Sequence, residues 1–212
     1  MGRFADPFAS PTRQQVSLDR VAPRHRPSSG MPDLVSLFAA PEGYEAYAGV
    51  GSRETPPDVL REMSLLAAAL ERRGFTLRSG HAPGADQAFE SGVGDPRCAE
   101  IYLPWRGFEG SASVHYPRDL QLELKAEAIA QKHHPAWDRC SRGARALHSR
   151  NVKQVLGESL DRPARFCLAW TSDGQASGGT GQAIRIARTY GVPVLNLYGP
   201  PMRHAVLEAL GL

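Results

Sequence analysis

The feature that most constrains the fold of this sequence is a repeated alternation of short apolar runs and longer runs with helical spacing. Glycine stands at many of the turns between them. The short runs are typical of β-strands and lie at 44–51, 75–80, 99–104, 165–170 and 192–197. The longer runs lie at 55–73, 84–93, 119–133, 147–157, 181–191 and 201–212. This alternation predicts an α/β fold, with a doubly wound, mostly parallel sheet in a single domain.

The first long helical run carries start and stop signals. Thr55 is a good N-cap, Pro56 and Pro57 suit a first turn, and Asp58 completes a spacing similar to a capping box. Apolar residues then recur at helical spacing until Gly74. We therefore expect a helix that is capped by Thr55 and ends before Gly74.

The chain divides into an N-terminal arm and one domain. Residues 1–40 are rich in Pro, Ser and Arg and have no sustained period, which predicts a flexible arm or a segment draped over a partner. A transit peptide is an alternative for this segment, although its aspartates count against one. The ordered domain is expected at 41–212, with an elaboration beside the sheet at about 105–147.

Composition excludes some classes of protein. Hydrophobic residues make up 42% of the chain, but no run of about eighteen apolar residues could cross a membrane. The N-terminus lacks the compact apolar segment of a secretory signal. The three cysteines are odd in number and form no Cys-x-x-Cys pair, which fits reduced thiols better than disulfides. We therefore expect a cytoplasmic protein with no membrane partner.

The charged residues are mostly arginine on the positive side. The net charge is +3, only three of the 25 cationic residues are lysine, and the other 22 are arginine. Guanidinium groups suit phosphate and carboxylate groups. An arginine-rich genome would explain the same bias. The composition therefore permits a nucleotide or nucleic-acid partner without requiring one.

Three glycine-rich loops follow expected strands, at 49–55, 79–86 and 171–181. Ligands of open parallel sheets gather at the carboxyl ends of the strands, where glycine lets the backbone approach and helix N-termini attract anions. Any one such turn has a structural explanation, but three at one edge predict a phosphate-bearing ligand. Glu54 breaks the Gly-x-Gly-x-x-Gly dinucleotide pattern, and no Walker motif is present.

Four segments together resemble a known superfamily. They are "YAGVGSRETP", "SGHAPGADQAFESG", "LHSRNVKQVLG" and "SGGTGQAIRIARTYGVPVLNL", and they span about residues 44–198. Their order and spacing are similar to those of the SLOG superfamily, which includes DprA-like proteins and LOG-type nucleotide phosphoribohydrolases. Within this superfamily, the chain most resembles the short DprA-like proteins that are often encoded by phages and bacteria. The resemblance implies a Rossmann-like fold, a nucleotide-like ligand without a required cofactor, and a homodimer.

The LOG-type signatures match this chain in part. His148, Ser149, Arg150 and Asn151 resemble the His-x-Arg-Lys signature, with Asn in place of Lys. The run at 178–181 reproduces the Gly-Gly-x-Gly of the second signature.

The rest of the second signature departs from the enzymes. Gln182 stands where they carry Thr, and Arg185 stands where they carry the catalytic Glu. Hydrolysis of an N-glycosidic bond needs a carboxylate, which Arg185 does not supply. The resemblance therefore favours binding over hydrolysis.

Other carboxylates keep the enzymatic alternative open. Asp86, Glu54 or Asp173 could replace the lost Glu, and Asp86 is the first candidate because it lies in the first turn of a helix. The helix dipole explains an acid at that position equally well. Arg53 and Arg150 suit a phosphate. Asp86 and Arg150 are the candidate catalytic residues.

The candidate ligand-binding residues come from the three loops and the two signatures. Thr180 and Gln182 could bond a phosphate or a ribose, and His81 is a candidate general acid or base-edge contact. The full set is Gly49, Gly51, Ser52, Arg53, Ser79, Gly80, His81, Gly84, Asp86, Arg150, Asn151, Thr171, Gly178, Gly179, Thr180, Gly181 and Gln182.

The sequence predicts no metal site. His133, His134, Cys140 and His148 lie within sixteen residues, but their spacing fits no familiar zinc pattern. His134 precedes Pro135 and is better explained as part of a packed corner.

Three functions follow, in order of preference. The first is a nucleotide-binding sensor, sequestering protein or DNA-processing accessory protein. The second is DprA-like binding of single-stranded DNA, which the arginines of the arm favour. The third is a LOG-type nucleotide N-glycosidase. The arginines of the arm are Arg3, Arg13, Arg20, Arg24 and Arg26.

Overall fold

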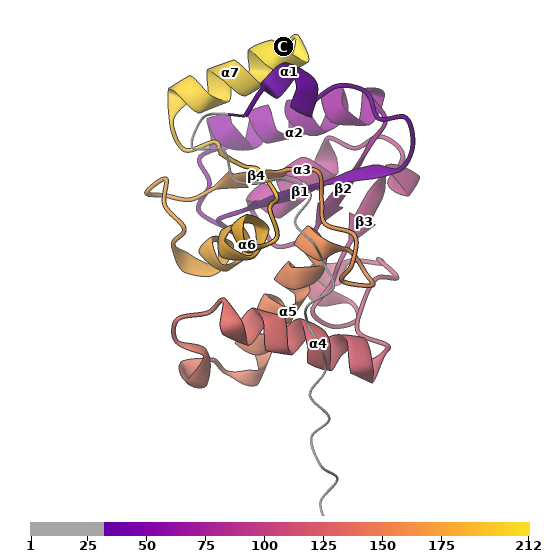
Figure 1. Ribbon diagram of the computed structural model, residues 1–212, viewed down its shortest axis with the longest axis vertical. Helices are drawn as coiled ribbons and strands as arrows, with labels where there is room; N and C mark the ends of the chain where they lie inside the picture. Colours follow the sequence, from indigo (N-terminus) through magenta and orange to yellow (C-terminus); the bar gives the residue numbers. More distant parts are fainter. Residues whose placement is uncertain (1–31) are drawn as a thin grey trace, which may run out of the picture.

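Five parallel strands form the central sheet, in the order β3-β2-β1-β4-β5 (Figure 1). The structure is a computed structural model, and it describes residues 32–212. The strands are β1 (Glu45–Gly51), β2 (Phe75–Ser79), β3 (Ala99–Ile101), β4 (Cys167–Trp170) and β5 (Val194–Asn196). Every strand pair is parallel. The predicted doubly wound, Rossmann-like α/β domain is confirmed.

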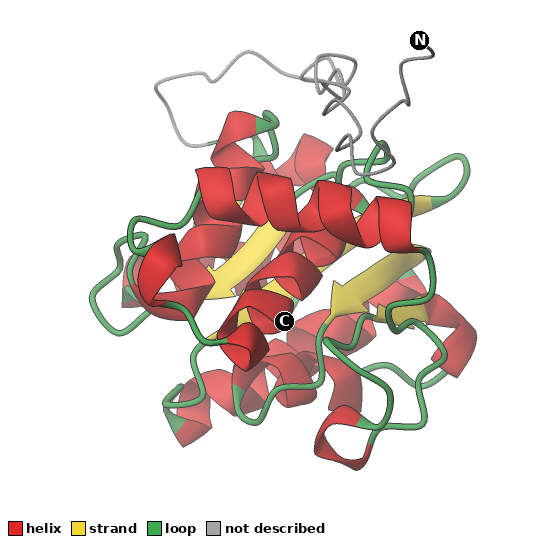
Figure 2. Ribbon diagram, turned by 90° about the horizontal axis from the view of Figure 1, so that it is seen from below, coloured by secondary structure: helices red, strands yellow, loops and turns green. Residues whose placement is uncertain are grey.

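Helices cover both faces of this sheet (Figures 1 and 2). One face carries α1 (Leu34–Leu37), α2 (Pro57–Arg72), α3 (Ala85–Ser91) and α7 (Pro200–Leu210). The other face carries α4 (Leu120–Lys132), α5 (Arg142–Leu156) and α6 (Gly178–Thr189). The connections between β2 and α5 contain the 3-10 helices η1 (Pro96–Cys98), η2 (Phe108–Gly110) and η3 (Trp137–Arg139). Because both faces are covered, the strands are apolar runs.

Alternate residues of β1 enter two separate hydrophobic cores. Tyr47 packs in the core beneath α2, where its ring stacks on Phe166 with centroids 5.5 Å apart. Ala48 and Val50 belong to the core beneath α5 and α6. This period of two is what a strand with both faces covered requires.

The order of the strands creates one reversal in the sheet. From β1 the chain builds outward through β2 and β3, and it then returns to the other side of β1 to form β4 and β5. The loops after β1 and β4 therefore leave neighbouring strands toward opposite faces. In open α/β sheets a ligand crevice forms at this position, outside the carboxyl ends of the strands.

The starts of α2, α5 and α6 differ from the sequence-based expectations, and α5 begins at Arg142 instead of at residue 147. Thr55 is not the N-cap of α2: its Oγ1 donates to Ser52 O at 2.8 Å, and Pro56 occupies the cap position. The glycine run at 178–181 was expected in a loop, but it forms the first turn of α6. Glycine is a poor helix former, so its presence concealed where this helix begins.

The structure describes part of the expected N-terminal arm and all of the expected elaboration at 105–147. Of the expected arm, residues 1–31 lie outside the described residues. Its remainder includes α1, whose N-cap is Asp33, and Phe38, which is fully buried against Phe166. The elaboration expected at 105–147 contains α4 and the start of α5, and α4 packs on α5.

No helix in the described part of the chain is long and apolar enough to span a membrane.

Candidate functional site

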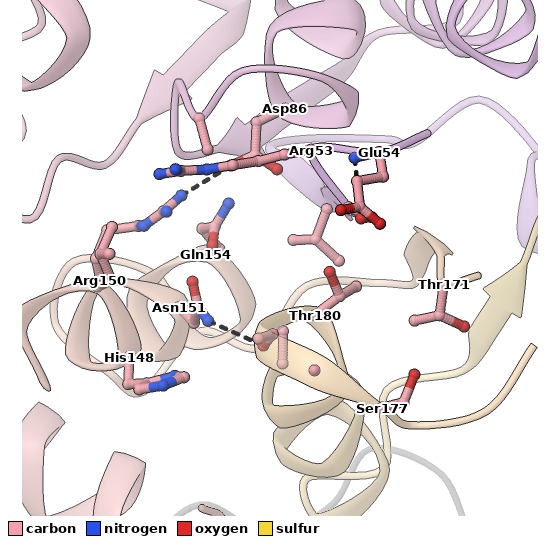
Figure 3. A pocket seen from close by; sticks show the side chains of 18 of the residues that line it. Arg53, Glu54, Asp86, His148, Arg150, Asn151, Gln154, Thr171, Ser177 and Thr180 are labelled. Carbon is pink, nitrogen blue, oxygen red and sulfur yellow. Dashed lines mark hydrogen bonds and ion pairs between the residues drawn. The ribbon is translucent and has the colours of Figure 1, made fainter. Parts of the chain in front are cut away.

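A cavity of about 580 Å³ lies at the carboxyl ends of β1 and β4, where the sheet reverses (Figure 3). Its walls come from the loops after β1, β2 and β4, from the first turn of α6 and from one face of α5. The three glycine-rich loops of the sequence therefore meet at one place. Ten of the candidate ligand-binding residues line this cavity, namely Gly51, Ser52, Arg53, Asp86, Arg150, Asn151, Thr171, Gly178, Gly179 and Thr180.

The first turn of α6 presents free backbone amides to the cavity. The N-cap Ser177 makes no side-chain capping bond to this turn, because its Oγ donates to Asp173 Oδ1 at 2.8 Å. The first intrahelical bond is that of Gly181 N to Ser177 O, so the amides at 178–180 have no acceptor within the helix. Residues 178–180 line the cavity. Free amides and the positive end of the helix dipole suit an anion such as phosphate.

A buried ion pair lies across the cavity from α6 (Figure 3). Arg150, on α5, donates from Nη1 to Asp86 Oδ2 at 2.8 Å, and both side chains are about 95% buried. Gly80 allows this approach, because a Cβ there would lie 1.2 Å from Arg150 Nη1. A buried pair holds its geometry because removing either partner leaves a desolvated charge. Asp86 is therefore engaged by Arg150 and helps to position it.

Two buried donors in the cavity wall have no partner among the described residues. They are Arg150 Nε and Gln154 Nε2, on side chains that are 6% and 1% exposed. Figure 3 shows the Gln154 side chain beside Arg150 and Asn151, with its amide end toward the cavity. Buried polar atoms almost always have a hydrogen-bond partner, and these two donors still have that capacity at the cavity wall.

Gln182 organises the neighbouring side chains instead of lining the cavity. Its Oε1 accepts from Asn151 Nδ2 at 3.0 Å and lies 3.1 Å from His148 Nδ1, while its Nε2 donates to Ala130 O at 3.2 Å. Gln182 is fully buried. The expectation that it contacts the ligand is not supported by this placement, because its side chain is used to hold Asn151 and His148.

Several glycines among the candidates serve packing. Gly49 faces Phe89, and a Cβ at Gly51, which does line the cavity, would lie 2.4 Å from Ala85 Cβ. Gly84 has a φ of 89° and lies against the backbone of Ser52. Gly49, Gly80, Gly84 and Gly181 do not line the cavity. These glycines bring the surrounding elements together and shape the site indirectly.

Two polar candidates are also placed elsewhere. Ser79 is fully buried, and its Oγ donates to Gly49 O at 2.8 Å, which ties β2 to β1. His81 has a φ of 59°, and its Nδ1 lies 2.6 Å from Glu90 Oε2. His81 contributes to a different hollow, beside the loop at 110–115. Neither residue lines the main cavity.

Arg185 is anchored to the backbone outside the cavity. Its Nε donates to His133 O at 2.8 Å and its Nη1 donates to Ala176 O at 2.6 Å. Arg185 does not line the cavity, so the position that the resemblance assigned to a catalytic Glu lies outside it. Of the alternative carboxylates, Glu54 and Asp86 line the cavity and Asp173 does not.

The main residue that sequence reasoning missed is Gln154. Ala144, Leu147, Arg150, Asn151 and Gln154 all line the cavity, at the spacing of one helix face. Two of these residues were candidates, so the helical period of α5 carries the signal that extends the site to Gln154.

Comparison with protein-family models, with curated proteins and with solved structures finds no match to this chain.

The site is therefore interpreted from its own geometry. Apolar surface from Val50, Leu147 and Ala183 adjoins amides, two arginines and two carboxylates. A concave wall with a few converging polar groups is typical of small-molecule sites, and the volume falls within their range of roughly 300–1,000 Å³.

Proposed function

We propose that the chain binds a nucleotide or nucleotide derivative in this cavity, with a phosphate group at the first turn of α6. The protein would then act as a sensor, a sequestering protein or a DNA-processing accessory protein, as the SLOG resemblance implies. The observation that carries the proposal is that free amides and unpartnered buried donors line one cavity. Each is a donor, and a nucleotide offers acceptors on its phosphate, its ribose and its base.

The remaining walls fit the other parts of a nucleotide. Arg53 lies exposed at the cavity and provides a cation that no ion pair engages among the described residues. Gln154 offers a donor for a ribose hydroxyl or a base edge. Leu147 and Ala82 supply apolar surface for a base. A phosphate at α6 therefore leaves room for the nucleoside toward α5 and the loop after β1.

A thermal-shift panel of nucleotides and their matching nucleosides tests this proposal. Nucleoside mono- and diphosphates, cyclic nucleotides and ADP-ribose are compared with the nucleosides at equal concentration. At a ligand concentration 100-fold above Kd, stabilisation is about 2.7 kcal/mol, or about 5–10 °C for a domain of this size. We expect such a shift with at least one nucleotide and a much smaller shift with its nucleoside. Equal shifts, or no shift across the panel, would contradict the proposal.

The second candidate function is hydrolysis of a nucleotide N-glycosidic bond, and the position of Glu54 favours it. Glu54 lines the cavity and is exposed, whereas Asp86 is held by Arg150. A free carboxylate could activate water or stabilise an oxocarbenium ion.

Release of free base from nucleoside monophosphates, measured by chromatography, tests this second candidate. Glu54→Gln should reduce base release by at least about 100-fold, since one general base contributes about 10²–10⁴-fold, while nucleotide binding persists. No base release by the unaltered protein, or full release by Glu54→Gln, would remove this function for Glu54.

Single-stranded DNA binding, homodimer formation and a cytoplasmic location stay predictions. The arginines that favour DNA binding lie between residues 3 and 26, outside the described residues. Within the described part of the chain, no specific contact favours DNA over a free nucleotide.

A further inference from the structure

Three potential metal ligands from different segments meet beside α5. His134 follows α4, Cys140 follows η3, and His148 lies on α5. One ligand atom from each lies within 4.8 Å of the others. The sequence predicted no metal site because these residues are six and eight positions apart. The connection between α4 and α5 turns back over α5, so spacing along the chain did not reveal their proximity.

A chain of hydrogen bonds through the buried Gln182 side chain constrains the tautomer of His148. Gln182 Nε2 donates to Ala130 O, and Asn151 Nδ2 donates to Gln182 Oε1. The amide is therefore oriented so that its oxygen accepts from His148 Nδ1 at 3.1 Å. This orientation favours the tautomer of His148 with its proton on Nδ1 and the lone pair on Nε2. Metal-binding histidines are typically held in this way, with the second nitrogen donating to a fixed acceptor.

Cys140 Sγ lies near both ring nitrogens of His134, close enough for a side-chain rotation to bring the two residues onto one ion. Cys140 Sγ lies 3.7 Å from His134 Nδ1 and 3.9 Å from His134 Nε2. Zinc bonds of about 2.3 Å to sulfur and about 2.1 Å to nitrogen place tetrahedral neighbours about 3.6 Å apart. Nδ1 accepts a bond of 3.2 Å from Ala136 N, which coordination at that nitrogen would replace. The other polar contact of the thiol is with Ala136 O at 3.6 Å.

Trp137 provides an apolar cover for this cluster. Its ring centroid lies 6.2 Å from that of His134 and 6.3 Å from that of His148. The centroids of the two imidazoles are 4.3 Å apart. Trp137 is buried, whereas His134 and Cys140 are partly exposed. The cluster is therefore backed by apolar surface and reachable by a solvated ion.

We propose that His134, Cys140 and His148 bind one divalent metal ion of borderline softness, of which Zn²⁺ is the type. Two imidazoles and a thiolate select such an ion over Mg²⁺ or Ca²⁺, which prefer oxygen. On binding, the Cys140 thiol releases its proton to solvent and no electron is transferred. Three protein ligands leave one tetrahedral position for water or another ligand. His148 also lines the cavity proposed for the nucleotide, but binding of the metal ion does not depend on nucleotide binding.

Cobalt titration tests this proposal with the full chain, purified without an affinity tag and stripped with a chelator. Co²⁺ should produce tetrahedral visible bands and a thiolate charge-transfer band that saturate at one equivalent, and Zn²⁺ should abolish both. Cys140→Ser should remove the charge-transfer band, and His134→Gln should weaken the affinity for Co²⁺ by at least tenfold.

Matched controls are present in the chain. Cys98→Ser should keep the charge-transfer band, because Cys98 lies on η1 and outside this cluster. His133→Gln should keep the affinity, because both ring nitrogens of His133 are already bonded, to Ile129 O and Thr189 Oγ1. No charge-transfer band, or a band that survives Cys140→Ser, would overturn the proposal.

A measurement on the unaltered chain remains decisive even if a variant fails to fold. Zn²⁺ should slow alkylation of Cys140 by at least tenfold and leave Cys98 unaffected, as measured by peptide mass spectrometry. Equal alkylation rates of Cys140 with and without Zn²⁺ would overturn the proposal. Neither experiment contains a nucleotide, so failure here is distinguishable from failure of the proposed function.

Discussion

Arg150 shows how single residues set the polarity of the cavity. Its side chain leaves α5, passes over Gly80 and meets Asp86 on α3, so its charge is neutralised inside the protein. The positive character available to a ligand then comes from the first turn of α6 and from Arg53. Arg150 contributes directional donors rather than a free charge, which fits a role in positioning a phosphate ester or a ribose.

The buried pair should contribute far more to stability than an exposed one. Asp86 and Asp58 are each the second residue of a helix, and each is paired with an arginine. Their side chains are 5% and 56% exposed. Asp86→Asn should lower the free energy of unfolding by about 3–5 kcal/mol, because Arg150 keeps a buried charge. Asp58→Asn should cost much less, because the Asp58 side chain is largely exposed to solvent.

Urea unfolding followed by circular dichroism measures both variants under the same conditions. The difference between the two costs is informative, because the substitution and the helix position are the same. Similar losses of unfolding free energy for the two variants would show that the buried Asp86–Arg150 pair stabilises the protein no more than the exposed pair does.

At the scale of elements, α5 and α6 position most of the site, and the sequence indicated their roles unevenly. The end of α5 at Gly157 was expected and is confirmed. The start of α6 was not recognised, because its first turn is mostly glycine and has low helix propensity. A turn without side chains is also what leaves its amides accessible. The feature that suits a ligand is the same feature that conceals the helix from propensity-based reasoning.

The edge of the sheet carries a pH-sensitive contact between two strands. Arg78 on β2 and Glu100 on β3 are partners in the parallel register and form an ion pair of 2.7 Å. Burial raises the pKa of Glu100, but the Arg78 charge and hydrogen bonds from Tyr102, Tyr44 and Arg78 outweigh it, so the pKa is lowered overall. A lowered pKa in the folded state means that the folded protein binds the proton less readily than the unfolded chain.

The free energy of unfolding should therefore fall in acid partly because of Glu100. Its contribution is present above the unfolded pKa, about 4.3, and is lost as pH falls through the lower folded pKa. Glu100→Gln should lower stability at pH 7 and converge with the unaltered protein in acid. Urea unfolding between pH 3 and 7 measures this, with exposed Glu208→Gln on α7 as the control. A parallel pH dependence for Glu100→Gln and the unaltered protein would contradict this role.

At the scale of the whole molecule, the order of the strands determines where the cavity forms. The cavity lies where the sheet reverses between β1 and β4, as the carboxyl-edge rule for open α/β sheets expects. The alternation of periods was enough to predict the fold class and the edge of the sheet that holds the loops. It could not predict Gln154 or the meeting of His134, Cys140 and His148. These two features depend on which face of α5 is turned toward the cavity and on how the connection between α4 and α5 folds back over α5.

The central claim is that the first turn of α6 holds a phosphate, and Gly179 allows the most direct test. A Cβ at Gly179 meets nothing within 4 Å, and its φ is not positive, so a side chain fits without strain. Gly179→Ala should bind as the unaltered chain does. Gly179→Asp places a carboxylate among the amides, where it stabilises the helix and repels an anion.

Isothermal titration of Gly179→Ala and Gly179→Asp with the nucleotide that gives the largest thermal shift decides the matter. We predict that Gly179→Asp loses at least tenfold in affinity, about 1.4 kcal/mol, while its melting temperature is no lower than that of Gly179→Ala. Equal affinities of the two variants would contradict a phosphate position at α6.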